Sequence, residues 1–130
     1  MPECQIVFYL SQDKYGEVYL ENCTDGKKTY PIIVLNPTYF NLGIHYMAEI
    51  MVHEMVHIYC NVKEIKDINY TNGYHNKNFR DNCIKFSLNC DRNDFGFSET
   101  SLSQKIIDLI DKFSRKSPLV VLLNKYTYSI

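Results

Sequence analysis

The sequence predicts a single α+β domain over residues 1–130, with an antiparallel sheet first and helices after it. β-branched and aromatic residues fill the first third of the chain, and turn signals separate them into short runs. From about residue 42 onward, apolar residues instead recur at three- and four-residue steps, which is the period of a helix. A length of 130 residues suits one domain, and no repeat, low-complexity tract or linker divides it.

Three strands are expected in the first third of the chain. Residues 5–10 and 17–21 form the first two, and residues 13–16 form the turn between them. Residues 25–28 (DGKK) are a second turn signal, and residues 30–36 (YPIIVLN) form a third, strongly apolar strand. Because short turns connect these strands, we expect them to pair in an antiparallel sheet.

The first helix is predicted over residues 42–59, where the pattern is the most regular in the chain. A polar loop is expected after it, at residues 61–72. The apolar stripe that predicts the helix consists of Ile44, Met47, Ala48, Met51, Val52, Met55, Ile58 and Tyr59.

Two further helices and a last strand complete the prediction. The second helix begins near His75 or Asn76, residues 91–97 turn the chain, residues 101–116 form the third helix, and residues 119–123 form a buried strand. The expected buried stripes are Phe79, Cys83, Phe86 and Cys90 on the second helix and Leu102, Ile106, Ile110 and Phe113 on the third.

Composition and charge argue against two classes of partner. With 14 basic and 15 acidic residues the net charge is −1 and no basic run is present, so direct nucleic-acid binding is not supported. No apolar stretch approaches the length of a membrane span. The five cysteines lack the close spacing of a zinc ribbon or redox pair, and the first residues lack a signal peptide, which together indicate a reducing, cytoplasmic setting.

The chemistry of the chain is expected at residues 53–57 (HEMVH), in the middle of the first predicted helix. His53 and His57 are four residues apart, so their rings project from one helix face about one turn apart. At this separation two imidazole nitrogens can meet one Zn²⁺, each at about 2.0–2.1 Å. The alternative is a helix whose two histidines are satisfied by neighbouring side chains, but the mid-helix position favours a metal site.

The pattern is typical of zinc peptidases. In such a site Zn²⁺ lowers the pKa of a bound water and polarises the scissile carbonyl. Glu54 lies to the side of the histidine pair, where it reaches the water without binding the metal. It takes the proton of the water as general base and later passes it to the leaving amine.

A catalytic zinc ion requires a third protein ligand and one open position. His45 lies eight residues before His53, about 12 Å along the helix axis, which is too far to bind the same ion. His75 follows the loop, where the chain can fold back, and neutral imidazole suits zinc, so His75 is favoured. The alternative is an acidic third ligand, for which the candidates are Glu64, Asp67, Asp81 and Glu99.

Two runs of sequence carry a resemblance to a known family. Residues 50–59 (IMVHEMVHIY), followed by residues 73–80 (GYHNKNFR), resemble the SprT-like zinc metallopeptidase family, to which Spartan-related proteins belong. That family pairs a His-Glu-x-x-His helix with a later His-Gly-x-x-Phe-type element that supplies the third zinc ligand. The apolar strand at residues 32–37 is similar to the strand that the family places before its active-site helix. The resemblance covers about residues 15–90.

The resemblance implies a small zincin-like domain that binds one Zn²⁺ through His53, His57 and His75 and uses Glu54 as the catalytic acid/base. Phe79 would seat the second helix. The strand at residues 32–36 would resemble the edge of a substrate cleft, which pairs with an extended peptide through backbone hydrogen bonds. The residues expected to contact substrate are Ile33, Val34, Leu35, Asn36 and Tyr74.

The chain departs from the family pattern in three respects. Asn76 stands where the family usually has glycine, no zinc ribbon or basic tail follows, and an upstream helix is missing. A minimal catalytic domain is therefore expected. Family members cut proteins, in some cases proteins crosslinked to DNA, and the charge of this chain does not favour the DNA-linked substrates.

Two side chains near the motif have two interpretations each. Glu49 lies one turn before His53 and either orients a ligand ring or is a solvated surface carboxylate. Tyr74 either stabilises an oxyanion or only packs.

The expected function is a zinc endopeptidase that hydrolyses protein substrates. The alternatives are a non-catalytic binding module with a structural zinc and a zinc hydrolase of a non-protein amide.

Overall fold

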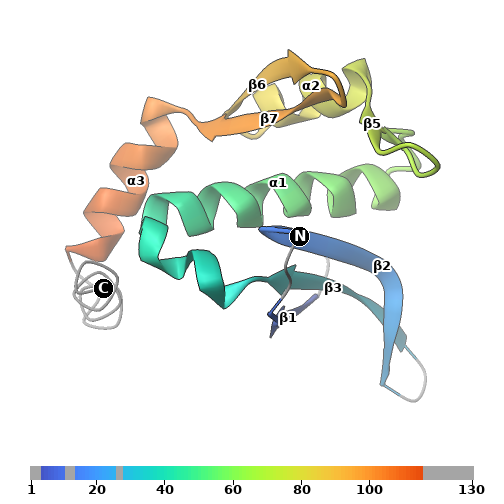
Figure 1. Ribbon diagram of the computed structural model, residues 1–130, viewed down its shortest axis with the longest axis horizontal. Helices are drawn as coiled ribbons and strands as arrows, with labels where there is room; N and C mark the ends of the chain where they lie inside the picture. The colour runs from blue at the N-terminus through green and yellow to red at the C-terminus, as the bar shows by residue number, and fades with distance from the viewer. Residues whose placement is uncertain (1–3, 11–13, 26–27, 116–130) are drawn as a thin grey trace.

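The computed structural model describes residues 4–10, 14–25 and 28–115, and they form the predicted α+β fold. A long helix, α1 (Ile44–Val62), lies between two small sheets (Figure 1). α1 contacts β2 and β3 of the first sheet on one side and β6 and β7 of the second sheet on the other. Residues 53–57 therefore lie in the middle layer of the molecule.

The first sheet has the strand order β1-β3-β2, and β3 pairs parallel with β1 and antiparallel with β2. The prediction of a purely antiparallel sheet is wrong for β1. The most apolar strand occupies the centre, where Ile33 and Leu35 are 1% and 2% exposed and pack with residues of α1, and the other two strands flank it. The strands of this sheet are β1 (Gln5–Phe8), β2 (Gly16–Asp25) and β3 (Lys28–Leu35).

The central position of β3 also corrects the expectation that residues 32–36 form the edge of a cleft. Strands pair with both sides of β3, so its backbone has no free side for a peptide. Asn36 follows β3 and caps the next element, because its side chain accepts a hydrogen bond from the Thr38 amide and donates one to the Lys14 carbonyl. The edge next to α1 belongs to β2.

The first helix begins later than predicted. Residues 37–42 form a 3-10 helix, η1 (Pro37–Leu42), and Gly43, with φ of +96°, separates it from α1. α1 then continues to Val62, three residues beyond the predicted end. Its apolar residues face two ways, since Ile50 packs toward the first sheet and Val56 toward the second.

The second sheet has the order β4-β5-β7-β6 and corrects the predicted turn at residues 91–97. A hairpin of β6 and β7 occupies this region, and Cys90 lies on β6, not on the second helix. The burial of β6 does not follow a regular apolar alternation, so the periodicity that marks a strand is missing from its sequence. The strands are β4 (Ile68–Asn69), β5 (Tyr74–His75), β6 (Leu88–Asn93) and β7 (Gly96–Leu102).

The two further helices are confirmed as α2 (Lys77–Lys85) and α3 (Gln104–Ser114), both shorter than predicted. Phe79 and Cys83 are fully buried, as expected.

Some residues of the predicted stripes lie outside the helices or face solvent. Phe86 is the C-cap of α2 and 36% exposed, Leu102 belongs to β7, and Phe113 is 64% exposed. The predicted strand at residues 119–123 lies outside the described residues. Within the described part of the chain, no helix combines the length and apolar character that crossing a membrane requires.

Candidate metal centre

The three histidines predicted as metal ligands come together in the structure. α1 presents His53 and His57, and β5 presents His75, so that one ring nitrogen of each lies within 4.8 Å of the others. His45 is not part of the cluster, because its Nε2 pairs with the Asp111 carboxylate of α3 at 2.6 Å. These three imidazoles could hold a metal ion.

The position of His75 depends on a close backbone contact with Gly96. β5 runs parallel to β7 at the pair His75–Gly96, and the His75 amide donates to the Phe95 carbonyl at 2.9 Å. A Cβ on Gly96 would lie 2.1 Å from the His75 carbonyl oxygen, and Gly96 has φ of +77°. Only glycine suits this position, because any side chain would push His75 away from its place beside the other two histidines.

Asn76, which stands where the resembled family has glycine, has a structural role. Its side-chain oxygen accepts hydrogen bonds from the Asn78 and Phe79 amides and so caps α2. Its side-chain nitrogen donates to the Lys66 carbonyl at 2.8 Å, which ties the start of α2 to the loop after α1. The backbone of Asn76 is extended, with φ of −92°, so glycine is not required there.

Phe79 is the apolar floor of the cluster. Its ring, which is 0% exposed, lies with its centroid 4.9 Å from that of His53, 4.5 Å from His57 and 4.7 Å from His75. It stacks on His57 with an interplanar angle of 19°. The predicted packing role of Phe79 is thus observed, and it includes direct contact with all three imidazoles.

The Nδ1 atom of each imidazole has a hydrogen-bond partner. His57 Nδ1 donates to the buried Asp67 carboxylate at 2.6 Å, and His75 Nδ1 donates to the Gly73 carbonyl at 2.9 Å. Carboxylate and carbonyl oxygens accept hydrogen bonds, so Nδ1 is the donor in both rings. In the neutral tautomer that carries its proton on Nδ1, an imidazole has its lone pair on Nε2.

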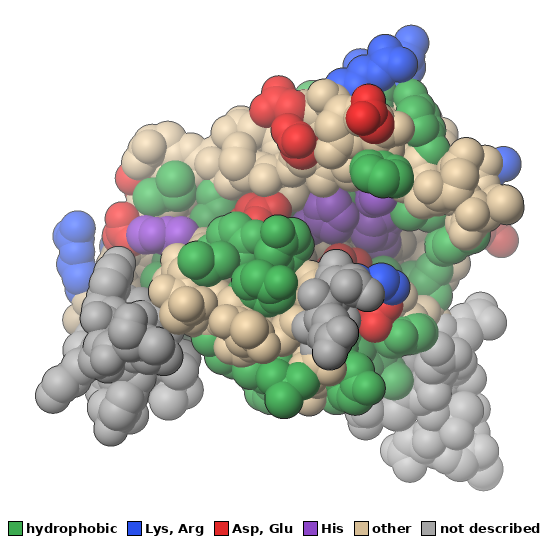
Figure 2. Space-filling view, in the orientation of Figure 1, with side chains coloured by type: hydrophobic (Ala, Val, Ile, Leu, Met, Phe, Trp, Pro, Cys, Tyr) green, Lys and Arg blue, Asp and Glu red, His purple; other side chains and the backbone are tan. Residues whose placement is uncertain are grey.

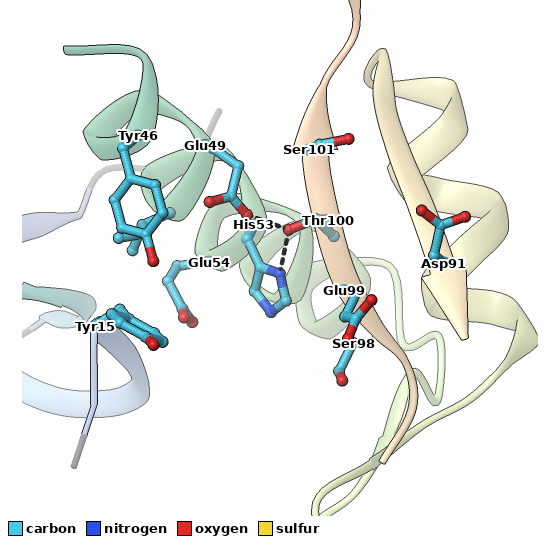
Figure 3. Close-up of a pocket in the computed structure, with 12 residues that line it drawn as sticks. Tyr15, Tyr46, Glu49, His53, Glu54, Asp91, Ser98, Glu99, Thr100 and Ser101 are labelled. Carbon is cyan, nitrogen blue, oxygen red and sulfur yellow. Dashed lines mark hydrogen bonds between the residues drawn. The ribbon is translucent and has the colours of Figure 1, made fainter. Parts of the chain in front are cut away.

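The Nδ1 atom of His53 also has a hydrogen-bond partner, which is the hydroxyl group of Thr100. Its Nδ1 lies 3.0 Å from Thr100 Oγ1 on β7. The Thr100 hydroxyl donates to the Glu49 carboxylate, and its oxygen is then free to accept from His53 Nδ1 (Figure 3). Of the two interpretations of Glu49, the structure supports the one in which it orients a ligand ring.

The ring nitrogens of the cluster lie close together, and the Nε2 atoms of His57 and His75 are 3.2 Å apart. Burial and the neighbouring imidazoles hold the pKa of His53 well below its usual range, and burial lowers that of His75 to about 4. These two rings are therefore neutral near pH 7, and a neutral imidazole can offer a lone pair to a metal ion.

Glu54 differs from the histidines beside it. It is 8% exposed, it is outside the histidine cluster, and no described residue forms a hydrogen bond with its side chain. Burial raises its pKa to about 7. Figure 3 shows the Glu54 carboxylate directed into a cavity. The side chain of Tyr15, the residue before β2, lines the same cavity.

The cluster opens into a hollow between the two sheets. Two cavities, of about 520 and 420 Å³, share Gly16, His53 and Glu54 as lining residues. Figure 2 shows histidine side chains at the surface of this hollow, below the β6–β7 side of the molecule. The hollow is large enough for part of a peptide.

Of the residues expected to contact substrate, none lines these two cavities. Ile33, Leu35 and Asn36 are buried, and Val34 lines another cavity, on a different part of the first sheet. Tyr74 lies next to the third histidine but does not line either cavity. The tyrosines that line them are Tyr15, Tyr46 and Tyr70.

One residue of the site has a role different from the one that the sequence predicted, and another residue was not identified from the sequence. Asp67, a candidate ligand, orients His57 instead, and Thr100 was not singled out at all. The other acidic candidates, Glu64, Asp81 and Glu99, lie outside the cluster. No local pattern marks Thr100, because it contacts His53 only through the tertiary fold.

Comparison with protein-family models, with curated proteins and with solved structures yields no match for this chain.

Proposed function

We propose that this protein is a zinc-dependent metallopeptidase of SprT-like, zincin-like type that hydrolyses protein substrates. The observation that carries the proposal is the convergence of three imidazoles beside one buried carboxylate that has no hydrogen-bond partner among the described residues. The histidines supply binding, and Glu54 supplies a base beside them.

The donor set fits zinc better than a hard cation. Three neutral imidazoles without a carboxylate ligand suit Zn²⁺, whereas Ca²⁺ and Mg²⁺ prefer oxygen. In a tetrahedral site with Zn–N bonds of about 2.0–2.1 Å, two ligand nitrogens are about 3.3 Å apart. The observed 3.2 Å between the Nε2 atoms of His57 and His75 is close to this value. One bound Zn²⁺ would polarise a scissile carbonyl and make a water more acidic.

Glu54 is suited to the transfer of a proton. A carboxylate whose pKa is about 7 can accept a proton from the attacking water and return it to the leaving amine at neutral pH. Its burial next to His53 and the lack of hydrogen bonds to described residues leave its oxygens available. A purely structural zinc site has no use for such a group, which is the reason to favour catalysis over a binding module.

The edge of β2 favours a peptide as the substrate. Residues 15–18 are consecutive, and each lines one or both of the cavities at the cluster. Successive side chains of a strand point to opposite faces of the sheet, so consecutive residues line a cavity together only when the edge of the strand faces it. A Cβ on Gly16 would lie 2.5 Å from Ile50 Cγ2, so glycine lets this edge approach α1 closely. An extended peptide can add to the edge through backbone hydrogen bonds, whereas a small non-protein amide would not use it.

The test compares the native chain with Glu54→Gln, measuring zinc content and cleavage of an unfolded protein. We expect one zinc per chain in both proteins and cleavage only by the native chain. Glu64→Gln, which changes an exposed glutamate in the loop after α1, is the matched control and should cleave normally. Zinc in both proteins with cleavage by neither would instead support a binding module.

A further inference from the structure

The cavity of about 520 Å³ next to Glu54 has an acidic lining. Four carboxylates line it, namely those of Glu49, Glu54, Asp91 and Glu99, and no described lysine or arginine does. The neighbouring cavity differs, because there Lys14 pairs with Glu17 at 2.7 Å. The hollow therefore has one end lined by four carboxylates without a described lysine or arginine, and one end where a lysine pairs with one of two glutamates.

Asp91 and Glu99 are directly opposite each other on β6 and β7. Opposed residues of an antiparallel pair point to the same face with their Cβ atoms about 5 Å apart, so two like charges there destabilise the hairpin. Neither carboxylate forms an ion pair with a residue in the described ranges. In Figure 2, acidic side chains gather above the hollow, on the β6–β7 side. A cation between the two carboxylates would remove the repulsion.

The strand β7, which carries Glu99, faces the cavity with one edge. Residues 98–101 are consecutive and all line the cavity, although side chains along a strand alternate between faces. β5 pairs with β7 only at Gly96, so this part of the edge carries no neighbouring strand in the described structure. A second, independent observation points to a ligand here, because the buried Glu54 side chain has no described hydrogen-bond partner and is directed into the same cavity (Figure 3).

From this arrangement we infer that Asp91 and Glu99 form a subsite for a lysine or arginine side chain of the substrate. The inference rests on the proposed peptidase function and adds a substrate class to it. A basic side chain is long enough to pass from the peptide backbone beside Glu54 to the rim of the cavity, and its charge complements the lining.

The direction of β2 places this side chain on one side of the cleaved bond. Tyr15, just before β2, lines only the acidic cavity, Gly16 lines both cavities, and Val18 lines only the neighbouring one, so β2 runs away from the acidic cavity. A peptide that pairs antiparallel with β2, the more stable arrangement, runs the opposite way. Its C-terminal part then lies in the acidic cavity, so the basic residue follows the scissile bond.

The experiment measures binding and cleavage separately. Binding uses zinc-loaded Glu54→Gln chain and two fluorescent peptides that differ only in Lys or Gln on the C-terminal side of the bond. We expect about five- to tenfold tighter binding of the Lys peptide, because each partly exposed charge pair contributes modestly, and a smaller preference in 0.5 M NaCl. Adding Asp91→Asn and Glu99→Gln should remove the preference. Asp94→Asn, an acid in the same hairpin that does not line the cavity, should keep it.

The outcomes separate the two proposals. Equal affinity for the two peptides, or an unchanged preference after Asp91→Asn and Glu99→Gln, would overturn the subsite, even when the native chain cleaves both peptides. Preferential binding of the Lys peptide with no cleavage by the native chain would support the subsite and overturn the peptidase. The two substitutions relieve a repulsion, so the thermal stability of the variant should equal or exceed that of the parent, which excludes misfolding as the cause of a lost preference.

Discussion

The three imidazoles and the Glu54 carboxylate line the same cavity, yet their surroundings are opposite. Every imidazole has a partner at Nδ1, whether Asp67, Gly73 or Thr100, and an aromatic floor beneath it. Glu54 is as buried as His57 but has no hydrogen bond from a described residue. The difference matches the two proposed roles, because a metal ligand must be held in one orientation, whereas a general base must keep its oxygens free.

The largest expected effect is a loss of zinc affinity at the three histidines. His75→Ala should weaken zinc binding about a thousandfold, since it removes one of three ligands. His45→Ala should leave the affinity unchanged, because His45 pairs with Asp111 far from the cluster. Competition with a coloured chelator measures both. Equal retention by the two variants would show that residue 75 is not a ligand.

The next effect concerns Glu54 and the stability of the metal-free protein. The folded-state pKa of Glu54 is about 7, above the value of 4.5 for an exposed glutamate, so the folded chain keeps a proton that the unfolded chain releases. The free energy of unfolding of the native chain should therefore fall, relative to Glu54→Gln, as the pH rises from 4.5 to 7. The difference should reach about 2–3 kcal/mol by pH 8. Urea unfolding at several pH values measures it, and a difference that does not change with pH would contradict the burial of the carboxylate.

Asp67→Asn weakens the hydrogen bond that orients the His57 ring and leaves the ring itself in place. The neutral amide is a weaker acceptor for His57 Nδ1, so zinc affinity should fall about 10- to 100-fold while the protein stays folded. Asp81→Asn, at an exposed carboxylate that pairs with Arg80, is the control and should bind zinc normally. A normal affinity for Asp67→Asn would mean that the orientation of His57 does not depend on this bond.

The smallest effect is expected at Thr100. Thr100→Val removes the hydroxyl between His53 and Glu49 and should reduce zinc affinity by less than tenfold, because a neutral hydroxyl contributes less than a carboxylate. Thr100→Ser should restore the affinity, since it keeps the hydroxyl. Failure of serine to restore it would indicate that the methyl group, not the hydrogen bond, matters.

Helix α1 and the convergence of His75 with His53 and His57 were predictable from the sequence, whereas the arrangement of the surrounding sheets was not. The strand β6 escaped prediction because its residues are mostly polar and alternate irregularly in burial. The parallel pairing of β1 with β3 escaped because the turn signals at residues 13–16 and 25–28 say nothing about which strand occupies the centre. That choice depends on burying Ile33 and Leu35 against α1, which is a property of the whole fold.

The amino-acid sequence alone places His53, Glu54 and His57 in one region of a helix, because the geometry of residues one and four positions apart is local. It also gives the net charge and the number of histidines. The acceptor of each Nδ1 atom, the free edge of the first sheet and the position of Asp91 opposite Glu99 depend on the complete fold. Those contacts join residues as far as 47 positions apart, and the hydrophobic burial that creates them leaves no local pattern along the chain.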